Sequence, residues 1–424
     1  MIAKFKNLTN TEDKKRLLSN FFSLSLLQGA NYILPLITFP YLVRVLGIEY
    51  FGLLAFATAT IAYFNIITDY GFNLTATREV SIHRADKAKI VEIFSSVMTI
   101  KFILMFISLL LLSLLVFSFE KFAKDWEIYF FTFGIVVGQM LFPVWFFQGM
   151  ERMKYITSLN ILAKSIFTVA IFIFVQEQSD FYMVPILTSV GFIIAGIWSL
   201  VIIKEEFGVR FKWQSIETVK FYLKDGWYVF VSRIYVSLYT TTNVFLLGLL
   251  TNNTTVGYYS ITEKIVVAIG GFFEPANQTL YPYLAKKYKE NFIQFLQILK
   301  KIAMLFLALS FSFVIVSEYF KEEIVYFVIG EYNFEITTLL SIFLIRILTY
   351  PFGTLFSNSL IIMKRKSQFI KGMQYTVILN FILVPPLIFI FGVKGMIIGM
   401  LVISFFIITY YYFVLKFIYF KGTL

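Results

Sequence analysis

Charged side chains inside long apolar runs are the residues of this 424-residue chain with the most capacity for chemistry. A charge at the centre of a bilayer helix costs about 2.5–3.5 kcal/mol, so such a residue pairs with another charge or faces a water-filled pathway. The acids in such runs are Asp69, Glu263 and Glu274. The bases are Lys101, Lys164, Arg233, Lys264 and Arg346.

These bases outnumber the acids, so pairing with one another cannot neutralise all of them. We therefore expect a cationic, water-containing cavity that suits an anionic group such as phosphate or pyrophosphate. Lys101 and Arg346 are the strongest candidates, because each lies about 15 Å from a helix end. For Lys164 and Arg233, an ion pair with an intramembrane acid explains the position of the charge equally well. Lys264 is the fifth candidate substrate-binding residue. The three acids are candidate coupling or gating groups.

Other kinds of site are disfavoured by residue type. The chain has no Cys and a single histidine, His83, which falls in a polar segment between two apolar runs. We therefore expect no disulfide, iron–sulfur cluster, zinc–thiolate site, histidine-based metal site or Ser-His-Asp triad. No cofactor and no metal are expected.

The elements that must carry these charges are membrane helices. Hydrophobic residues make up 59% of the chain and charged residues only 15%, against about 45–50% and about 25% in soluble domains. The apolar runs are continuous rather than alternating, which indicates helices and not barrel strands. We predict an all-α membrane protein with twelve spans, at roughly 17–42, 51–72, 92–118, 127–149, 157–176, 182–203, 226–250, 257–282, 299–317, 336–362, 369–391 and 395–415.

Lysine and arginine fix the predicted orientation. With the N-terminus in the cytoplasm, the inside segments carry 27 basic residues and the outside segments carry 5. This bias places both termini in the cytoplasm. Most of the net charge of +12 is then a topology signal that faces anionic lipid head groups, so nucleic acid is not an expected partner. No polar interval is long enough for a soluble catalytic domain, and we expect a protein that is not an enzyme.

An internal repeat divides the predicted spans into two pseudo-symmetric six-helix lobes around a central cavity. The lobes are residues 1–203 and 226–424, joined by a cytoplasmic linker at 204–225. A shift of 205 positions places Asp69 on Glu274 and Gly52 on Gly257. The same shift relates two polar stripes with helical spacing. Gln28, Asn31, Pro35 and Thr38 overlie Arg233, Val236, Thr240 and Asn243. We expect Gln28, Asn31, Thr240 and Asn243 to line the cavity.

Three segments carry a resemblance to a known family. They are TFPYLVRVLGIEYFGLLAFATATIAYFNIITDYGFNLTATREVS at 38–81, WFFQGMERMKYI at 145–156 and DGWYVFVSRIYVSLYTTTNVFLLGLLTNNTTVGYYSITEKI at 225–265. With these segments, and in length and order of apolar runs, the chain resembles the polysaccharide and O-antigen flippases (Wzx type) of the multidrug/oligosaccharidyl-lipid/polysaccharide exporter superfamily. By this likeness Asp69 is the best-anchored site residue, whereas the five bases match only by depth and sign.

The resemblance implies a function and its partners. The substrate would be an undecaprenyl-pyrophosphate-linked oligosaccharide repeat unit, turned from the cytoplasmic to the periplasmic leaflet of the bacterial inner membrane by alternating access. Further partners would be membrane lipids, a polysaccharide polymerase and a chain-length regulator. Because the inside-negative potential opposes export of a diphosphate, we also expect coupling to H⁺ or Na⁺.

Three alternatives stay open. A multidrug/cation antiporter of the same fold should carry net negative charge in its cavity, the opposite of the charges counted here. A lipid II-type peptidoglycan precursor flippase would usually have two additional helices. A membrane polymerase or ligase would need a sizeable periplasmic loop, and the longest outside interval, about residues 318–335, is short.

Overall fold

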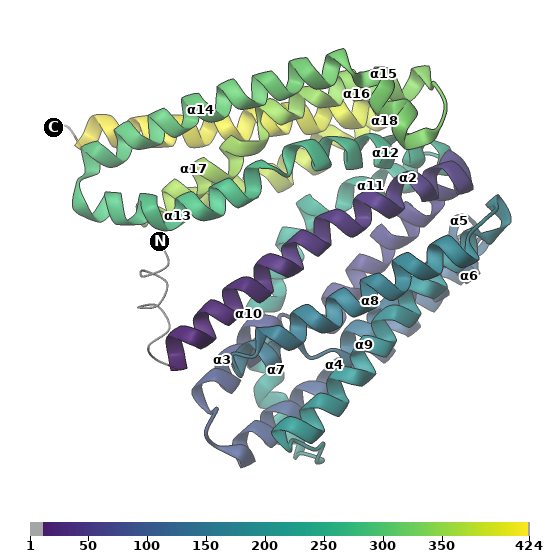
Figure 1. The fold of residues 1–424 in the computed structure, drawn as a ribbon, viewed down its shortest axis with the longest axis vertical. Helices are drawn as coiled ribbons and strands as arrows, with labels where there is room; N and C mark the ends of the chain where they lie inside the picture. The colour runs from purple at the N-terminus through teal and green to yellow at the C-terminus, as the bar shows by residue number, and fades with distance from the viewer. Residues whose placement is uncertain (1–11, 423–424) are drawn as a thin grey trace. The chain divides into compact units, whose positions relative to one another are not determined.

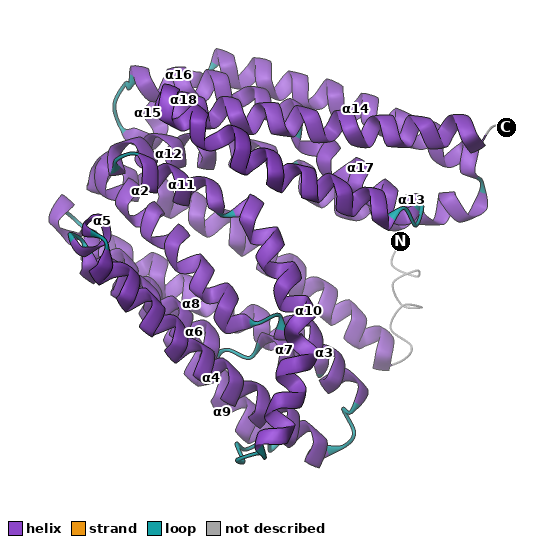
Figure 2. Cartoon of the chain, turned by 180° about the vertical axis from the view of Figure 1, so that it is seen from behind, coloured by secondary structure: helices purple, strands orange, loops and turns teal. Residues whose placement is uncertain are grey.

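The chain folds into helices throughout the part that the structure describes. The computed structural model describes residues 12–422, and within them the side chains of 29, 34–235, 237 and 241–417. Every regular element in these ranges is a helix, and Figure 2 shows no strand among them. The prediction of an all-α protein is confirmed.

Helix α4 (Lys87–Ser118) shows how the apolar sequence positions a charge. One of its faces carries exposed Phe and Leu side chains: Phe102, Phe106, Leu110, Leu114 and Phe117. The other face is buried: Lys101, Met105, Ser108, Leu112 and Val116. Both series follow the helical period. A helix that exposes large apolar side chains along its length suits lipid, and the same geometry turns Lys101 inward.

Within the residues that the structure describes, eight helices or helix pairs are long and apolar enough to cross a membrane. Two of them, Leu34–Ile82 with 49 residues and Lys366–Phe417 with 52, exceed the about 20 residues of one span. Each is broken within, at Gly47 (φ 74°) and at Gly392 (φ 58°), where two helices join. The predicted spans at 226–250 and 257–282 fall on the interrupted helices α10 to α13. The chain is a multi-pass membrane protein, and the count of twelve spans stays a prediction.

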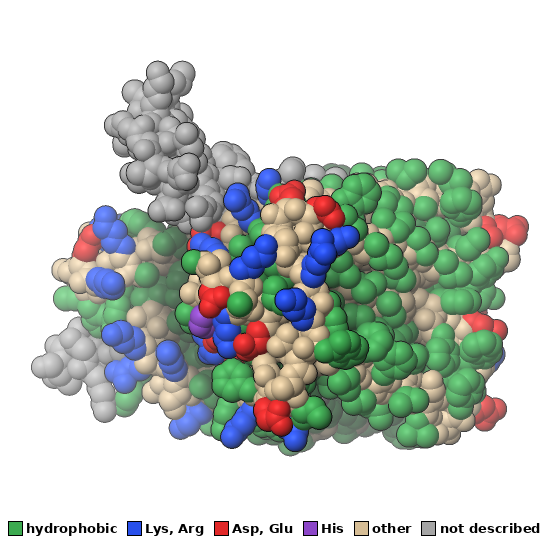
Figure 3. All heavy atoms as spheres, turned by 90° about the horizontal axis from the view of Figure 1, so that it is seen from below, with side chains coloured by type: hydrophobic (Ala, Val, Ile, Leu, Met, Phe, Trp, Pro, Cys, Tyr) green, Lys and Arg blue, Asp and Glu red, His purple; other side chains and the backbone are tan. Residues whose placement is uncertain are grey.

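Charged and apolar side chains separate on the surface. In Figure 3, blue and red side chains gather together, and an expanse of green apolar side chains lies beside them. This separation is typical of a protein with a lipid-covered belt and a polar end.

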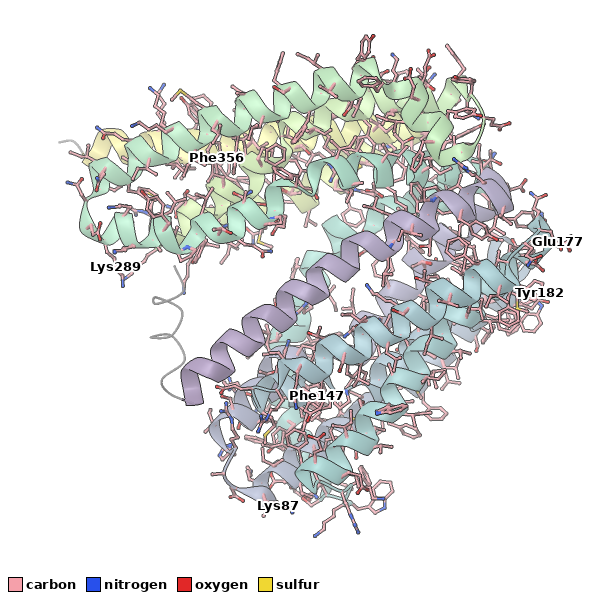
Figure 4. All side chains as sticks on the ribbon, viewed as in Figure 1. Lys87, Phe147, Glu177, Tyr182, Lys289 and Phe356 are labelled. Atoms are coloured by element: carbon pink, nitrogen blue, oxygen red, sulfur yellow. The ribbon has the colours of Figure 1, made fainter. Side chains whose placement is uncertain are left out.

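The chain divides into two units. Unit 1 is the chain up to Leu46 together with Ala57–Ser237. Its long helices α4, α6, α8 and α9 run side by side (Figure 1). Figure 4 labels Lys87 at one end of this unit and Glu177 and Tyr182 at the other. Besides α4, its elements are α2 (Glu12–Asp69), α3 (Phe72–Ile82), α5 (Glu120–Ala123), α6 (Trp126–Leu141), α7 (Val144–Gly149), α8 (Met153–Phe174), η1 (Gln178–Tyr182), α9 (Met183–Phe207) and α10 (Ile216–Thr240).

The WFFQGMER segment packs against α3 and α8 inside unit 1. Trp145, Phe146 and Phe147 are fully buried, and Figure 4 labels Phe147 inside the unit. Arg84 donates to the Gly149 carbonyl oxygen at 3.1 Å and pairs with Glu151 at 2.9 Å. This segment of the family resemblance therefore holds α3, α7 and α8 together.

Unit 2 is Gly47–Phe56 together with Leu238–Leu424. Within it α12 packs on α16, and α17 packs on both α13 and α18 (Figure 1). Figure 4 labels Lys289, near the end of α13, and Phe356 of α17 in this unit. Its elements are α11 (Thr242–Leu250), α12 (Asn253–Gly270), α13 (Phe273–Glu290), α14 (Phe292–Tyr319), α15 (Lys321–Ile329), α16 (Phe334–Leu344), η2 (Ile345–Leu348), α17 (Tyr350–Ile362) and α18 (Lys366–Gly422).

These units differ from the predicted lobes (1–203, linker 204–225, 226–424) at two places. The predicted linker is helical from Ile216, and its α10 stays with unit 1 up to Ser237. The physical reason is a set of contacts made by α10. Asp225 pairs with Arg78 at 3.0 Å, and the Phe230 ring stacks on Tyr70 at 4.6 Å. The second difference is residues 47–56, which pack in unit 2 although the chain on both sides of them belongs to unit 1.

A reciprocal glycine contact explains the second difference. A Cβ atom on Gly52 would collide with the carbonyl oxygen of Asn253, and one on Gly257 would collide with that of Ile48. The 205-position shift relates Gly52 to Gly257 and Ile48 to Asn253. Each half of the contact therefore uses residues at positions that the predicted repeat treats as equivalent. Only glycine lets the two backbones approach this closely.

We predict that Gly52→Ala and Gly257→Ala each destabilise the protein. The added methyl groups meet backbone atoms that cannot move aside, and such overpacking costs about 1–3 kcal/mol. Thermal unfolding in detergent, followed by tryptophan fluorescence, should give a lower midpoint for both variants. Gly29→Ala is the matched control, because a Cβ there meets nothing within 4 Å and alanine is the better helix former. Unchanged midpoints for both test variants would contradict the contact.

Candidate functional site

A polar cavity of about 420 Å³ lies in unit 1 where its helices are interrupted. Its walls come from both sides of the break between α2 and α3, both sides of the break between α6 and α7, and parts of α4, α8, α9 and α10. The charged side chains on its walls are Asp69, Lys101, Lys164 and Arg233. Interrupted helices supply both polar side chains and unpaired backbone groups at membrane depth, which is how transporters build binding sites.

The first break is encoded by Asp69-Tyr70-Gly71. Helix α2 ends at Asp69, and the next two residues take positive φ angles of 50° and 80°. Gly71 fits because it tolerates this conformation, and a side chain there would also meet Val229 at 2.5 Å. The break leaves the Asp69 carboxylate at a helix C-terminus, where the helix dipole disfavours negative charge. Asp69 therefore needs donors and a cation nearby.

Lys101 and Asn73 supply that compensation. The Lys101 Nζ atom lies 3.5 Å from Asp69 Oδ1, and the Asn73 amide donates to both carboxylate oxygens at 3.1 and 3.0 Å. The Lys101 side chain is only 4% exposed, whereas that of Asp69 is 23% exposed. The most deeply placed base of unit 1 is therefore held in an ion pair.

Lys164 and Arg233 add positive charge to the same cavity. Lys164 projects from the middle of α8 and Arg233 from α10. Three cations and one carboxylate line the cavity, so its formal charge is +2. The structure thus brings together four of the predicted site residues, and the excess of bases over acids concentrates here.

The sequence analysis missed the amide side chains of this cavity. Asn65 donates to Gln139 Oε1 at 2.6 Å, and Asn160 also lines the wall. The signal was present as spacing: Asn65, Asp69 and Asn73 recur every four residues, and Asn160 precedes Lys164 by four.

In unit 2 the deep base is also paired. Arg346 Nη1 lies 3.8 Å from Glu263 Oε1, which accepts a hydrogen bond from the Tyr259 hydroxyl at 2.9 Å. Arg346 sits in η2, a 3₁₀ turn that interrupts the helix between Leu344 and Thr349. The 205-position shift maps this turn onto the α6–α7 break at Phe142 and Pro143. Lys264 points elsewhere: it is exposed on α12, with its Nζ atom 5.2 Å from the centre of the Phe51 ring.

A second cavity, of about 450 Å³, opens beside this turn. Three predicted site residues, Asn243, Glu274 and Arg346, line it. The Asn380 amide donates to Asn243 Oδ1 at 2.9 Å. Arg346 and Glu274 cancel in formal charge, so this cavity is neutral. The predicted cavity residues Gln28, Asn31 and Thr240 lie outside the residues whose side chains the structure describes.

Comparison with known proteins gives one family and several relatives. The family model described as "Polysaccharide biosynthesis protein" matches residues 17–288. A proposed O-antigen transporter of Escherichia coli (strain K12) is 35% identical over 289 residues, which are 68% of this chain and 70% of that protein. A proposed O-antigen transporter of Shigella dysenteriae is 27% identical over 391 residues, 90% of this chain and 96% of that one.

Solved structures share the fold at low identity. An inward-facing multidrug resistance transporter of the MATE family, in the MOP superfamily, aligns with a TM-score of 0.66 at 12% identity and covers 89% of this chain and 92% of its own. The lipid II flippase MurJ, in an inward closed conformation, aligns with a TM-score of 0.66 at 14% identity, over 95% of this chain and 87% of its own. The predicted MOP-type fold is confirmed.

We predict that Lys101 and Asp69 are energetically coupled. Lys101→Met leaves a carboxylate without its cation at a helix C-terminus and should destabilise the protein, whereas adding Asp69→Asn should recover part of the loss. A double-mutant cycle on denaturant or thermal unfolding should give a coupling energy of about 0.5–3 kcal/mol. Additive effects of the two substitutions would show that the pair does not interact.

Proposed function

The chain belongs to the polysaccharide biosynthesis protein family, and we propose that it is a flippase for lipid-linked oligosaccharides. The proposed substrate is an oligosaccharide repeat unit of O-antigen or a related surface polysaccharide, attached to undecaprenyl pyrophosphate. The proposed direction is from the cytoplasmic to the periplasmic leaflet of the inner membrane, with both termini in the cytoplasm. The relatives named as O-antigen transporters support this substrate class.

The observation that carries the proposal is the charge of the unit 1 cavity. A diphosphate is the part of the substrate that lipid accepts least, and Lys164 and Arg233 offer it charge-assisted hydrogen bonds. The guanidinium group of Arg233 can donate two parallel bonds to phosphate oxygens, and the Lys164 ammonium acts as a compact charge. Asn65, Gln139 and Asn160 add neutral hydrogen-bonding groups beside them.

Transport requires no covalent step in this scheme, so we propose a transporter and not an enzyme. The cavity opens alternately to the two sides of the membrane, and the polyprenyl chain stays in lipid. The glycine breaks at Gly47 and Gly392 give the long helices α2 and α18 places to bend. Membrane lipids surround the protein, and a polymerase and a chain-length regulator act on the exported unit.

Coupling to H⁺ or Na⁺ belongs to the same proposal. Export of a diphosphate works against the inside-negative potential, at about 2.3 kcal/mol per charge per 100 mV. Among the candidate acids Asp69, Glu263 and Glu274, Asp69 lies beside the proposed diphosphate site and holds Lys101. Binding of a cation by Asp69 releases Lys101, so Asp69 is the proposed coupling group.

Two relatives of the fold suggest other substrates. A cationic drug would be repelled by a cavity of formal charge +2, which disfavours a multidrug antiporter. A lipid II-type precursor carries the same pyrophosphate and differs in the attached group, so only substrate assays separate it from the proposed oligosaccharide.

We predict that Lys164→Met and Arg233→Gln each reduce export of surface polysaccharide at least tenfold, because each removes a charge-assisted bond of about 1.5–3 kcal/mol. Surface polysaccharide is measured on gels from a deletion strain that expresses the variant, with immunoblots of the membrane fraction as a measure of protein level. Lys204→Gln is the matched control, since Lys204 is an exposed residue paired with Glu205. Normal export by both cavity variants would refute the cationic site.

Asp69→Asn should remove the dependence of transport on a cation gradient. The neutral amide cannot exchange a proton and binds a cation weakly. In proteoliposomes, transport by the wild type should change with an imposed proton or sodium gradient, and transport by the variant should not. Wild-type transport that ignores both gradients would refute coupling altogether, and a variant that keeps the wild-type response would exclude Asp69.

A further inference from the structure

The cavity of unit 2 has a different chemistry from that of unit 1. It carries no net charge, and hydroxyl groups dominate its polar wall: Thr349, Tyr350, Thr354, Ser357, Thr376, Ser404 and Tyr411. Two asparagines, Asn243 and Asn380, join them. Its volume of about 450 Å³ falls in the range of ordinary small-molecule sites, about 300–1,000 Å³. In the proposed flippase mechanism, this cavity has no role so far.

Three hydroxyl groups of this wall are arranged as acceptors. Thr349, Ser357 and Thr376 donate their only hydroxyl proton to backbone carbonyls of Arg346, Thr354 and Gly372, at 2.7, 3.1 and 3.0 Å. A hydroxyl has one proton and two lone pairs, so each of these oxygens keeps acceptor capacity.

Asn380 adds an acceptor that lacks a partner. Its side chain is 3% exposed, and its amide nitrogen donates to Asn243. Its Oδ1 atom is buried and has no hydrogen-bond partner among the described residues. Arg346 Nη1, at the same cavity, also makes no hydrogen bond to them, although it lies 3.8 Å from Glu263 Oε1. Buried polar atoms without hydrogen bonds call for an explanation, and a ligand with its own hydroxyl groups donates to the asparagine oxygen and accepts from the guanidinium.

We propose that the unit 2 cavity binds the uncharged sugars of the lipid-linked oligosaccharide through their hydroxyl groups, while the unit 1 cavity binds the diphosphate. This inference rests on the proposed function. Sugar hydroxyls both donate and accept, which matches acceptor oxygens beside the Arg346 guanidinium. Apolar side chains such as Phe369 and Met373 cover the rest of the wall and can pack on the faces of sugar rings.

Binding of the sugars in one cavity and of the diphosphate in the other decides which cavity sets substrate specificity. Every polyprenyl pyrophosphate carries the same charged group, so the unit 1 cavity cannot tell one repeat unit from another by its phosphates. A wall of hydrogen-bonding groups discriminates among sugars, because a missing or misplaced hydroxyl leaves a buried group unpaired. The unit 2 cavity is therefore the specificity site in this scheme.

The test compares two ligands that differ only in their sugars. Undecaprenyl pyrophosphate and the lipid-linked oligosaccharide that accumulates in the deletion strain are titrated against the full-length protein in nanodiscs, with native mass spectrometry as the readout. The double variant Ser357→Ala/Thr376→Val should bind the oligosaccharide form more weakly, by about fivefold for each lost hydrogen bond, and should bind undecaprenyl pyrophosphate as the wild type does. Lys164→Met should weaken both ligands.

Ser359→Ala/Thr337→Val is the matched control. Both hydroxyls bond to their own helix backbone, at Leu355 and Asn333, as those of the test pair do, and neither lines the cavity. This variant should bind both ligands normally. Equal binding of the oligosaccharide form by test and control variants would overturn the sugar site and leave the flippase proposal standing. A wild type that binds neither ligand would instead refute the proposed function.

A sodium ion is the alternative occupant of this wall of acceptor oxygens. If the test variant loses affinity for both ligands in the same proportion, and only when sodium is present, the cavity binds sodium and the sugar proposal is wrong. Loss confined to the oligosaccharide form, at all sodium concentrations, supports it.

Discussion

The ion pair between Lys101 and Asp69 is the interaction on which the rest of unit 1 depends. A charged lysine buried to 4% exposure in an apolar helix bundle is tolerated only with a counter-charge in reach. Asp69 supplies it from the end of α2, where a carboxylate would itself be unfavourable without Lys101. Each charge makes the other possible, and both line the polar cavity of unit 1.

That interior exists because the helices stop there. The α2–α3 break, the α6–α7 break and the 3₁₀ turn at Arg346 each place a polar or charged group beside an interruption. An unbroken apolar helix would offer lipid-like surface at the same depth. In both units the deepest base carries an acid partner, Asp69 or Glu263. Lys164 and Arg233 also line the unit 1 cavity and bring its formal charge to +2. The net positive formal charge therefore lies in the cavity of unit 1, whereas the cavity of unit 2 is neutral.

Some of this could be predicted from particular residues. Asp69 and Lys101 were identified as charges that lipid would not accept. The 205-position shift aligned Gly52 with Gly257, whereas the contact between their segments became visible only in the structure. Which of the other predicted site residues line a cavity could be read only from the way the helices pack. Lys264 directly follows Glu263, the acid that pairs with Arg346, yet Lys264 is exposed on α12, because adjacent positions on a helix point in directions about 100° apart. The position of a residue along a helix can be read from the sequence, whereas what its side chain faces depends on the neighbouring helices.

The sequence by itself determined the class of the protein: its long apolar runs and the charges within them fix helices, lipid as solvent and an excess of bases over acids. These properties follow from the cost of transferring residues into lipid, which each residue carries with it. Only the tertiary structure decided which charges pair, which cavity stays positive and which wall is made of hydroxyls. Those outcomes depend on contacts between residues far apart in the chain, such as Asn243 with Asn380, and no local pattern specifies them.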